Sequence, residues 1–211
     1  MKLYLIRHGR QNSTLCNVNA DLSPEGIRQA EALKNRLRNC GFKYDAIYAS
    51  TLIRAEHTAR IINYNELNIN IREGIKEIDF GELTGHTDTY IHEHFSEFEI
   101  LRKSAVSDIP FPGGECGSDV FGRAKPVIDE IVAQNYENVL IVSHGGTIRS
   151  LTAGLLGIDF SKKLLFGKNL ENCSITCIEY NRAANIYTLE LFNDYSHLEA
   201  FPELLRGAWK K

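Results

Sequence analysis

The chain has 211 residues, of which 43% are apolar and 24% charged, a composition typical of a globular protein with a buried core. Its formal net charge of −3 excludes the broad basic surface that nucleic acids and anionic membranes attract. The even composition, without a Pro- or Gly-rich linker, predicts a single domain over residues 1–211. Five cysteines without a Cys-x-x-Cys pair favour reduced thiols in a cytoplasmic protein, and no apolar run reaches the ~20 residues of a membrane span.

Short apolar runs and helical patterns alternate along most of the chain. In chain order they predict strand Lys2–Arg7, a helix that Ser23 caps and Gly41 ends, strand Ala46–Ala49, helix Ile53–Ile62, helix Asp119–Gln134, strand Val139–Ser143, a helix that begins after Gly146 and runs to about Leu156, and strands Ser174–Tyr180 and Ile186–Phe192. This alternation predicts an α/β fold with a mainly parallel sheet. The last two strands lack a helix between them, so we expect an antiparallel strand at one edge.

The stretch Gly85–Gly117 departs from this alternation. It is rich in histidine and aromatic residues and predicts a small helical cap, inserted over the carboxyl edge of the sheet, where open α/β sheets bind ligands. Within it, His92-Glu93-His94 fits no standard zinc spacing, so we expect a solvated helix face and no metal site.

Two histidines stand where predicted strands end. Strand Lys2–Arg7 leads into His8 and then a glycine, and strand Val139–Ser143 leads into His144 and two glycines. A helix begins after His144, and its free N–H groups suit a phosphate. Either histidine alone is most often a hydrogen-bonded core residue, but parallel strands bring their carboxyl ends to one edge.

Two arginines accompany these histidines. Arg7 ends the first strand, and Arg54 lies in the first turn of a helix, where a cation opposes the helix dipole and a functional demand would explain it. Arginine forks match phosphate oxygens, and a neutral imidazole can attack phosphorus. The guanidinium groups should lower the pKa of His8 and keep it neutral. Glu77 or Asp79 could then protonate the leaving alkoxide.

Six blocks around these residues resemble the histidine phosphatase superfamily, in its phosphoglycerate mutase-like branch. In family order over about residues 2–160, the blocks are Leu5-Ile6-Arg7-His8-Gly9, Leu22-Ser23-Pro24-Glu25-Gly26, Ala49-Ser50-Thr51-Leu52-Ile53-Arg54-Ala55, Glu77-Ile78-Asp79-Phe80-Gly81-Glu82-Leu83-Thr84-Gly85, Phe111-Pro112-Gly113-Gly114-Glu115 and Val142-Ser143-His144-Gly145-Gly146. The resemblance implies a three-layer α/β/α sandwich. It also implies phosphoryl transfer through a phosphohistidine, without a metal or a cofactor.

The resemblance further implies a role for each central residue. His8 is the nucleophile, and Glu77 is the general acid for the leaving group and then the base for water. The groups that bind and neutralise the phosphoryl group are Arg7, Arg54, His144 and the backbone N–H of Gly145. Where the family often has threonine and asparagine at the phosphate pocket, this chain has Gln11 and Thr14. Asn12 or Asn17 could take the place of that asparagine.

The sequence therefore predicts a phosphomonoester hydrolase that acts on a small phosphorylated metabolite. The alternative is a cofactor-dependent phosphoglycerate mutase. The family's mutases usually have a longer insert with paired arginines, whereas Gly85–Gly117 has only Arg102-Lys103 as an adjacent basic pair. A catalytically inactive binding protein is the weakest alternative, because all the central residues are intact. We expect neither nucleic acid nor a membrane as a partner, and a homodimer stays open.

Overall fold

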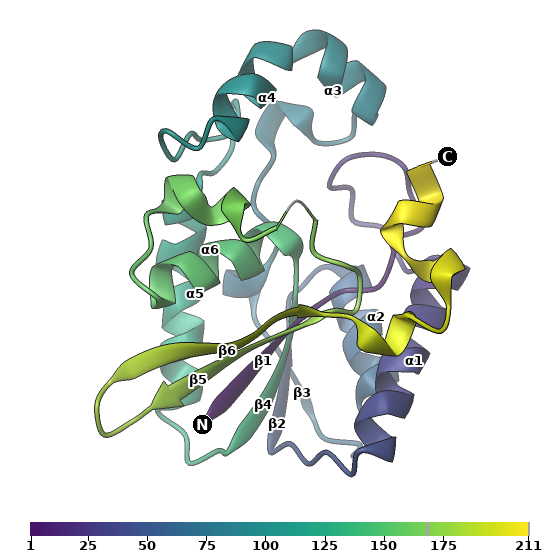
Figure 1. Cartoon of the computed structure of the whole chain (residues 1–211), viewed down its shortest axis with the longest axis vertical. Coiled ribbons are helices and arrows are strands. Elements are labelled where there is room, and N and C mark those ends of the chain that lie inside the picture. Colours follow the sequence, from purple (N-terminus) through teal and green to yellow (C-terminus); the bar gives the residue numbers. More distant parts are fainter. Residues whose placement is uncertain (168, 211) are drawn as a thin grey trace.

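The computed structural model describes residues 1–167 and 169–210 and has one six-stranded sheet with helices on both faces (Figure 1). In chain order the strands are β1 (Lys2–Arg7), β2 (Ala46–Ala49), β3 (Ile69–Ile71), β4 (Asn138–Ser143), β5 (Ile175–Asn181) and β6 (Ile186–Asp194). Their spatial order is β3-β2-β4-β1-β5-β6. The pairs from β3 to β1 are parallel, and β5 is antiparallel to both β1 and β6.

The predicted fold class is confirmed, including the antiparallel pairing at one edge of the sheet. β5 is the strand that runs against the others, and β6 lies outside it at the edge. The sequence patterns missed β3, because a strand of three residues is too short to show an alternation. It pairs with β2 at the opposite edge.

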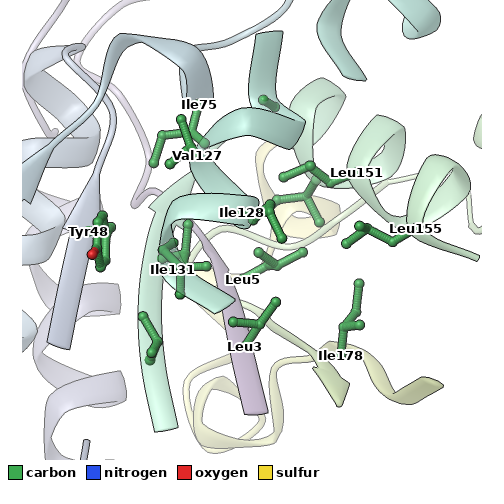
Figure 2. Close-up of a cluster of buried hydrophobic side chains, with 14 of the residues drawn as sticks. Leu3, Leu5, Tyr48, Ile75, Val127, Ile128, Ile131, Leu151, Leu155 and Ile178 are labelled. Carbon is green, nitrogen blue, oxygen red and sulfur yellow. The ribbon is translucent and has the colours of Figure 1, made fainter. Parts of the chain in front are cut away.

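Four helices form the two outer layers of the sandwich. They are α1 (Pro24–Asn39) and α2 (Ile53–Ile62) on one face of the sheet, and α5 (Gly117–Val132) and α6 (Gly145–Leu155) on the other (Figure 1). Alternate residues of β1 divide between the two cores: Leu3 and Leu5 pack towards α5 and α6 (Figure 2), whereas Ile6 packs towards α1 and α2. Each such buried side chain contributes about 1.5–3 kcal/mol, so the central strand is held from both faces.

The predicted cap consists of two short helices, α3 (Asp88–His94) and α4 (Ser96–Lys103), which lie beyond the carboxyl ends of the parallel strands (Figure 1). It packs through Ile91 and Phe111 onto Ile78 and Val120 of the main body. Short 3₁₀ turns occupy Glu73–Ile75, Gly81–Leu83 and Phe160–Leu165.

The C-terminal tail, residues 195–210, returns beside α1 through 3₁₀ turns at Ser196–Leu198, Pro202–Leu204 and Arg206–Lys210. Leu198 and Leu204 are buried, and the Gln29 amide of α1 donates to the Leu204 carbonyl at 2.7 Å. The tail is therefore anchored up to Leu204, next to the carboxyl edge of the sheet.

Candidate active site

The register of the sheet places the two predicted histidines side by side. β1 and β4 pair in parallel with Arg7 opposite Ser143, so the next residue of each strand is His8 or His144. The ring centroids of the two histidines lie 4.9 Å apart. His8 is 5% exposed and His144 is fully buried. The adjacency that the sequence predicted follows directly from the order of the strands.

Hydrogen bonds determine which nitrogen of His8 carries the proton. Its Nδ1 lies 2.6 Å from the carbonyl oxygen of Gly9, and a carbonyl can only accept, so Nδ1 is protonated. Its Nε2 accepts from Nε of Arg54 at 3.2 Å. Burial first, and then the charges of Arg54 and Arg7, hold the pKa of His8 well below its ordinary value. At neutral pH, Nε2 thus has a free-base lone pair beside a guanidinium group.

Arg54 is fixed by the loop that follows β1. It is 2% exposed, and its terminal nitrogens donate to the Val18 carbonyl at 2.8 Å and to the Asn17 side chain at 3.1 Å. These contacts account for a cation in the first turn of α2. Of the two asparagines that the sequence left open, Asn17 lines the cavity beside His8, whereas Asn12 is exposed.

Two hydrogen-bond donors near His8 are buried without a partner among the described residues. One is Nε of Arg7, whose terminal nitrogen donates to the Leu170 carbonyl. The other is Nδ1 of His144, whose Nε2 lies 2.6 Å from the Ser50 hydroxyl. Burial lowers the pKa of His144 well below its ordinary value, so its ring is neutral, and when the Ser50 hydroxyl donates to Nε2 the proton is on Nδ1. An unpaired buried donor costs about 1–3 kcal/mol, and an anion at this position would satisfy both.

Glu77 reaches the same place through the start of α6. Its Oε1 accepts the backbone N–H groups of Ile78 at 2.9 Å, Gly146 at 3.0 Å and Thr147 at 3.2 Å. A Cβ atom on Gly146 would lie only 2.7 Å from Oε1, so a glycine is needed there. Two N–H groups that the sequence suggested for phosphate therefore hold Glu77, and in the first turn of α6 the N–H of Gly145 is the one without an acceptor among the described residues.

Asp79, the other carboxylate that the sequence left open, lies outside the site. It is exposed, and its Oδ1 accepts the Gly81 N–H at 2.9 Å. The segment around it is irregular rather than a strand, so residues two apart do not share a face. The structure thus brings Glu77, and not Asp79, to the histidines.

Two adjoining cavities meet at this cluster. The nucleophile cavity, of about 410 Å³, is lined by His8, Arg54 and the loop residues Gln11 and Thr14, among others. The basic cavity, of about 700 Å³, is lined by Gly145, by residues of α4 and α6, and by residues 163–165, 169 and 170. Both cavities share four lining residues: Arg7, Glu77, Phe80 and Arg206. Every predicted site residue except His144 lines one of them, and the His144 ring lies beside the ring of His8.

Three further residues at the site escaped the sequence reasoning. Asn172 donates to the His8 carbonyl at 2.8 Å, and Arg149 and Arg206 line the basic cavity. Only Arg149 has a sequence signal, because it lies one helical turn beyond Gly145 and so shares its face of α6. Asn172 and Arg206 belong to irregular segments whose paths depend on tertiary packing.

Two histidines of the cap, His92 and His94, are exposed and contact other residues. His92 lies 3.2 Å from Glu99, and Nδ1 of His94 lies 2.9 Å from the Tyr90 carbonyl. In residues 1–167 and 169–210 no group of three or more His, Cys, Asp or Glu side chains could hold a metal ion. Within the same residues, no helix is long and apolar enough to cross a membrane.

Comparison with known proteins places this geometry in a family. A 2,3-bisphosphoglycerate-dependent phosphoglycerate mutase from Rhizobium etli is 32% identical over 161 residues, which cover 71% of this chain and 76% of the mutase. A mutant phosphoserine phosphatase from Entamoeba histolytica, solved with phosphoserine, has a TM-score of 0.76 at 28% identity and covers 93% of this chain and 98% of its own. The α-ribazole phosphatase from Shigella flexneri has a TM-score of 0.76 at 27% identity, with coverage of 92% and 97%. The sequence model of the histidine phosphatase superfamily (branch 1) matches residues 3–194, and the chain therefore belongs to this family.

Proposed function

We propose that the chain is a single-domain, metal-independent phosphomonoester hydrolase that acts on a small phosphorylated metabolite through a phosphohistidine at His8. The observation that carries this proposal is the neutral, buried Nε2 of His8. Around it lie the guanidinium of Arg54 and the unpaired donors of Arg7 and His144. This is a nucleophile surrounded by the positive charge and N–H groups that a phosphoryl group requires.

In the first step, the Nε2 lone pair of His8 attacks phosphorus, and the bond from phosphorus to the ester oxygen breaks. Arg7, Arg54 and His144 stabilise the negative charge that spreads over the three equatorial phosphoryl oxygens. The departing oxygen takes a proton from the Glu77 carboxyl. Because three N–H groups hold Oε1 in place, Oε2 is the oxygen that transfers this proton.

In the second step, a water molecule replaces the departed alcohol. The Glu77 carboxylate takes a proton from the water, whose oxygen attacks phosphorus and breaks the bond to Nε2. Inorganic phosphate leaves, and His8 returns to its neutral form with the proton on Nδ1. One carboxyl group therefore serves both steps without moving.

The solved relatives support hydrolysis of small phosphate esters, since the phosphoserine and α-ribazole phosphatases are similar to this chain over more than nine tenths of its length. The proposal is tested with an aryl phosphate and His8→Ala protein, with the exposed His92→Ala as the matched control. We expect His8→Ala to abolish turnover and the acid-labile phosphoenzyme, and His92→Ala to keep both. Appreciable turnover by folded His8→Ala protein would refute the assignment of the nucleophile.

A phosphoglycerate mutase is the second candidate, and the 32% identity to the Rhizobium etli enzyme favours it. A mutase must return the phosphoryl group to a bound phosphoglycerate before water takes it. Here the two cavities, of about 410 and 700 Å³, together exceed the usual range of small-ligand sites, about 300–1,000 Å³, so a phosphoglycerate would leave room for water. With 3-phosphoglycerate and catalytic 2,3-bisphosphoglycerate, we expect phosphate release to exceed interconversion of 2- and 3-phosphoglycerate. Faster interconversion would establish the mutase.

A further inference from the structure

The backbone that follows His8 leaves the sheet at once. β1 ends at Arg7, and the N–H of His8 donates to the Ser143 carbonyl of β4 at 3.0 Å. Beyond this bond the chain turns away from β4, so the peptides His8–Gly9 and Gly9–Arg10 are not part of the sheet. Polar groups of a buried backbone need partners. Because the His8 ring is attached to this segment, the groups that hold the segment also direct the ring.

The peptide His8–Gly9 is held at both ends by buried side chains. The Asn172 amide donates to the His8 carbonyl at 2.8 Å, and the Gly9 N–H donates to the Thr58 hydroxyl at 3.0 Å. Asn172 is 2% exposed and Thr58 is fully buried. Thr58 belongs to α2, whereas Asn172 lies shortly before β5, so the two contacts come from separate parts of the fold. Because a peptide is planar, a contact at each end fixes its orientation.

The next peptide, Gly9–Arg10, is held in the same way. Its carbonyl accepts from Nδ1 of His8 at 2.6 Å, and its N–H donates to the Gln29 side chain of α1 at 2.9 Å. Gln29 is fully buried. The carbonyl that keeps the proton on Nδ1 of His8 therefore belongs to a peptide whose other end is also fixed.

This segment has no room to shift towards α1. A Cβ atom on Gly9 would lie 2.6 Å from the Gly26 carbonyl oxygen, and a Cβ atom on Gly26 would overlap the carbonyl oxygen of Arg10. Glycine at both positions allows the first turn of α1 to press directly on the backbone after His8. The ring of His8 is thus attached to a segment that packing and hydrogen bonds confine together.

Building on the proposed nucleophile, we propose that Thr58 and Asn172 are positioning residues, which hold the peptide His8–Gly9 so that Nε2 of His8 points at the phosphorus atom. The Thr58 hydroxyl also donates to the Arg54 carbonyl at 2.7 Å. It therefore joins the backbone after His8 to the residue whose Nε contacts Nε2 of His8. The attacking atom and the guanidinium beside it keep one relative position. Such precision matters because a misplacement of about 1 Å can cost about 10²-fold in rate.

Thr58→Val tests this role, because valine has the shape of threonine without the hydroxyl. With an aryl phosphate, we expect the rate of phosphoenzyme formation at saturation to fall by roughly tenfold to a hundredfold. KM should stay close to native, since the groups that bind the phosphoryl group are unchanged. Thr58→Ser keeps a hydroxyl and should restore most of the rate. Asn172→Leu removes the contact at the other end of the peptide and should lower the rate as Thr58→Val does.

Thr152 provides the matched control. Like Thr58, it is fully buried in a helix, and its hydroxyl donates to the carbonyl four residues earlier, that of Ile148 at 2.8 Å. It lies seven residues beyond Gly145 along α6, a rise of about 10 Å from the site. Thr152→Val should keep the native rate. A native rate in folded Thr58→Val protein, or an equal loss in Thr152→Val, would overturn the proposal, because a merely structural role lowers only the melting temperature.

If the chain proves inactive on every ester, nuclear magnetic resonance of protein with isotope-labelled histidine still decides. Signals of His8 are identified by their absence from His8→Ala protein. In native and Thr152→Val protein, we expect a hydrogen-bonded Nδ1 proton that exchanges slowly with water. In Thr58→Val protein it should exchange about threefold to tenfold faster, as the loss of one hydrogen bond predicts. Faster exchange upholds the positioning role without the hydrolase, and unchanged exchange refutes it.

Discussion

Replacing Arg54 by methionine removes the group that contacts the attacking atom of His8. In the native protein, Nε of Arg54 donates to Nε2 of His8 at 3.2 Å, while its terminal nitrogens are held by Val18 and Asn17. The fork is therefore fixed before substrate arrives. Its removal should affect both the rate of phosphoryl transfer and the ionisation of His8.

The loss of rate can be judged from the geometry. Removing one preorganised donor from a buried charge-stabilising site costs typically about 10²–10³ in kcat. We expect this loss for Arg54→Met. For Arg54→Lys we expect a smaller loss, because an ammonium keeps the charge without the bidentate fork. The effect should fall on kcat more than on KM, since negative charge spreads over the phosphoryl oxygens mainly in the transition state.

The pH profile provides an independent reading of the same substitution. Next to burial, Arg54 is the largest cause that lowers the pKa of His8, so Arg54→Met should raise that pKa. Because only neutral His8 attacks, the acid limb of kcat/KM should move to higher pH. Steady-state assays from pH 4 to 8 on an aryl phosphate measure it, with Arg60→Met, an exposed arginine of the same helix paired with Glu56, as the control. An acid limb that stays in place, or moves down, would refute the electrostatic account of His8.

Three other predictions concern the acid, the metal and stability. Glu77→Gln should slow turnover of alkyl phosphates far more than the pre-steady-state burst on an aryl phosphate, by up to about 10²–10⁴-fold, and the same dependence in Asp79→Asn instead would move the acid. Chelation with EDTA should leave activity unchanged, because arginines neutralise the phosphoryl charge, and a loss that a divalent ion restores would contradict this. Burial lowers the folded-state pKa of His8, His144 and His197, the last to about 4. Protons therefore bind more tightly to the unfolded chain, and the free energy of unfolding should fall as pH drops from about 6.5 to 4. Each histidine contributes up to about 1.4 kcal/mol per pH unit to this decline. Urea unfolding across that range, with no such decline, would contradict the assignment of buried neutral histidines.

The parts of the site that the sequence predicted are those that local pattern and strand order determine. His8 and His144 follow short apolar strands. Because those strands pair in parallel, the two side chains lie at the same edge of the sheet. Arg54 was found through its conflict with the helix dipole, and at 2% exposure it is a buried residue, not a solvated one. Such inferences need only periodicity and the direction of the chain.

The parts that the sequence reasoning missed depend on long-range packing. β3 is too short to show a period, and the sequence did not show that the cap divides into the two helices α3 and α4. The count of basic residues within the cap overlooked Arg149 and Arg206, which enter the same cavity from α6 and from the tail. No local pattern shows that residue 206 returns to the end of β1, because that path rests on Leu204 and its contact with α1.

The start of α6 explains why these separate contributions work as one site. His144 precedes its first turn, the N–H groups of Gly146 and Thr147 hold Glu77, and Arg149 follows one turn later on the same helix. The His144 contact with the phosphoryl group, the N–H groups that hold the proton donor and Arg149 of the basic cavity therefore share one rigid element, which packs against the core through Ile148 and other apolar residues. A substitution that displaces α6 by a fraction of an ångström would misplace all three together. Protonation of the leaving alcohol and stabilisation of the phosphoryl group by His144 should thus be lost in parallel, whereas the position of His8 itself depends on β1 and α2.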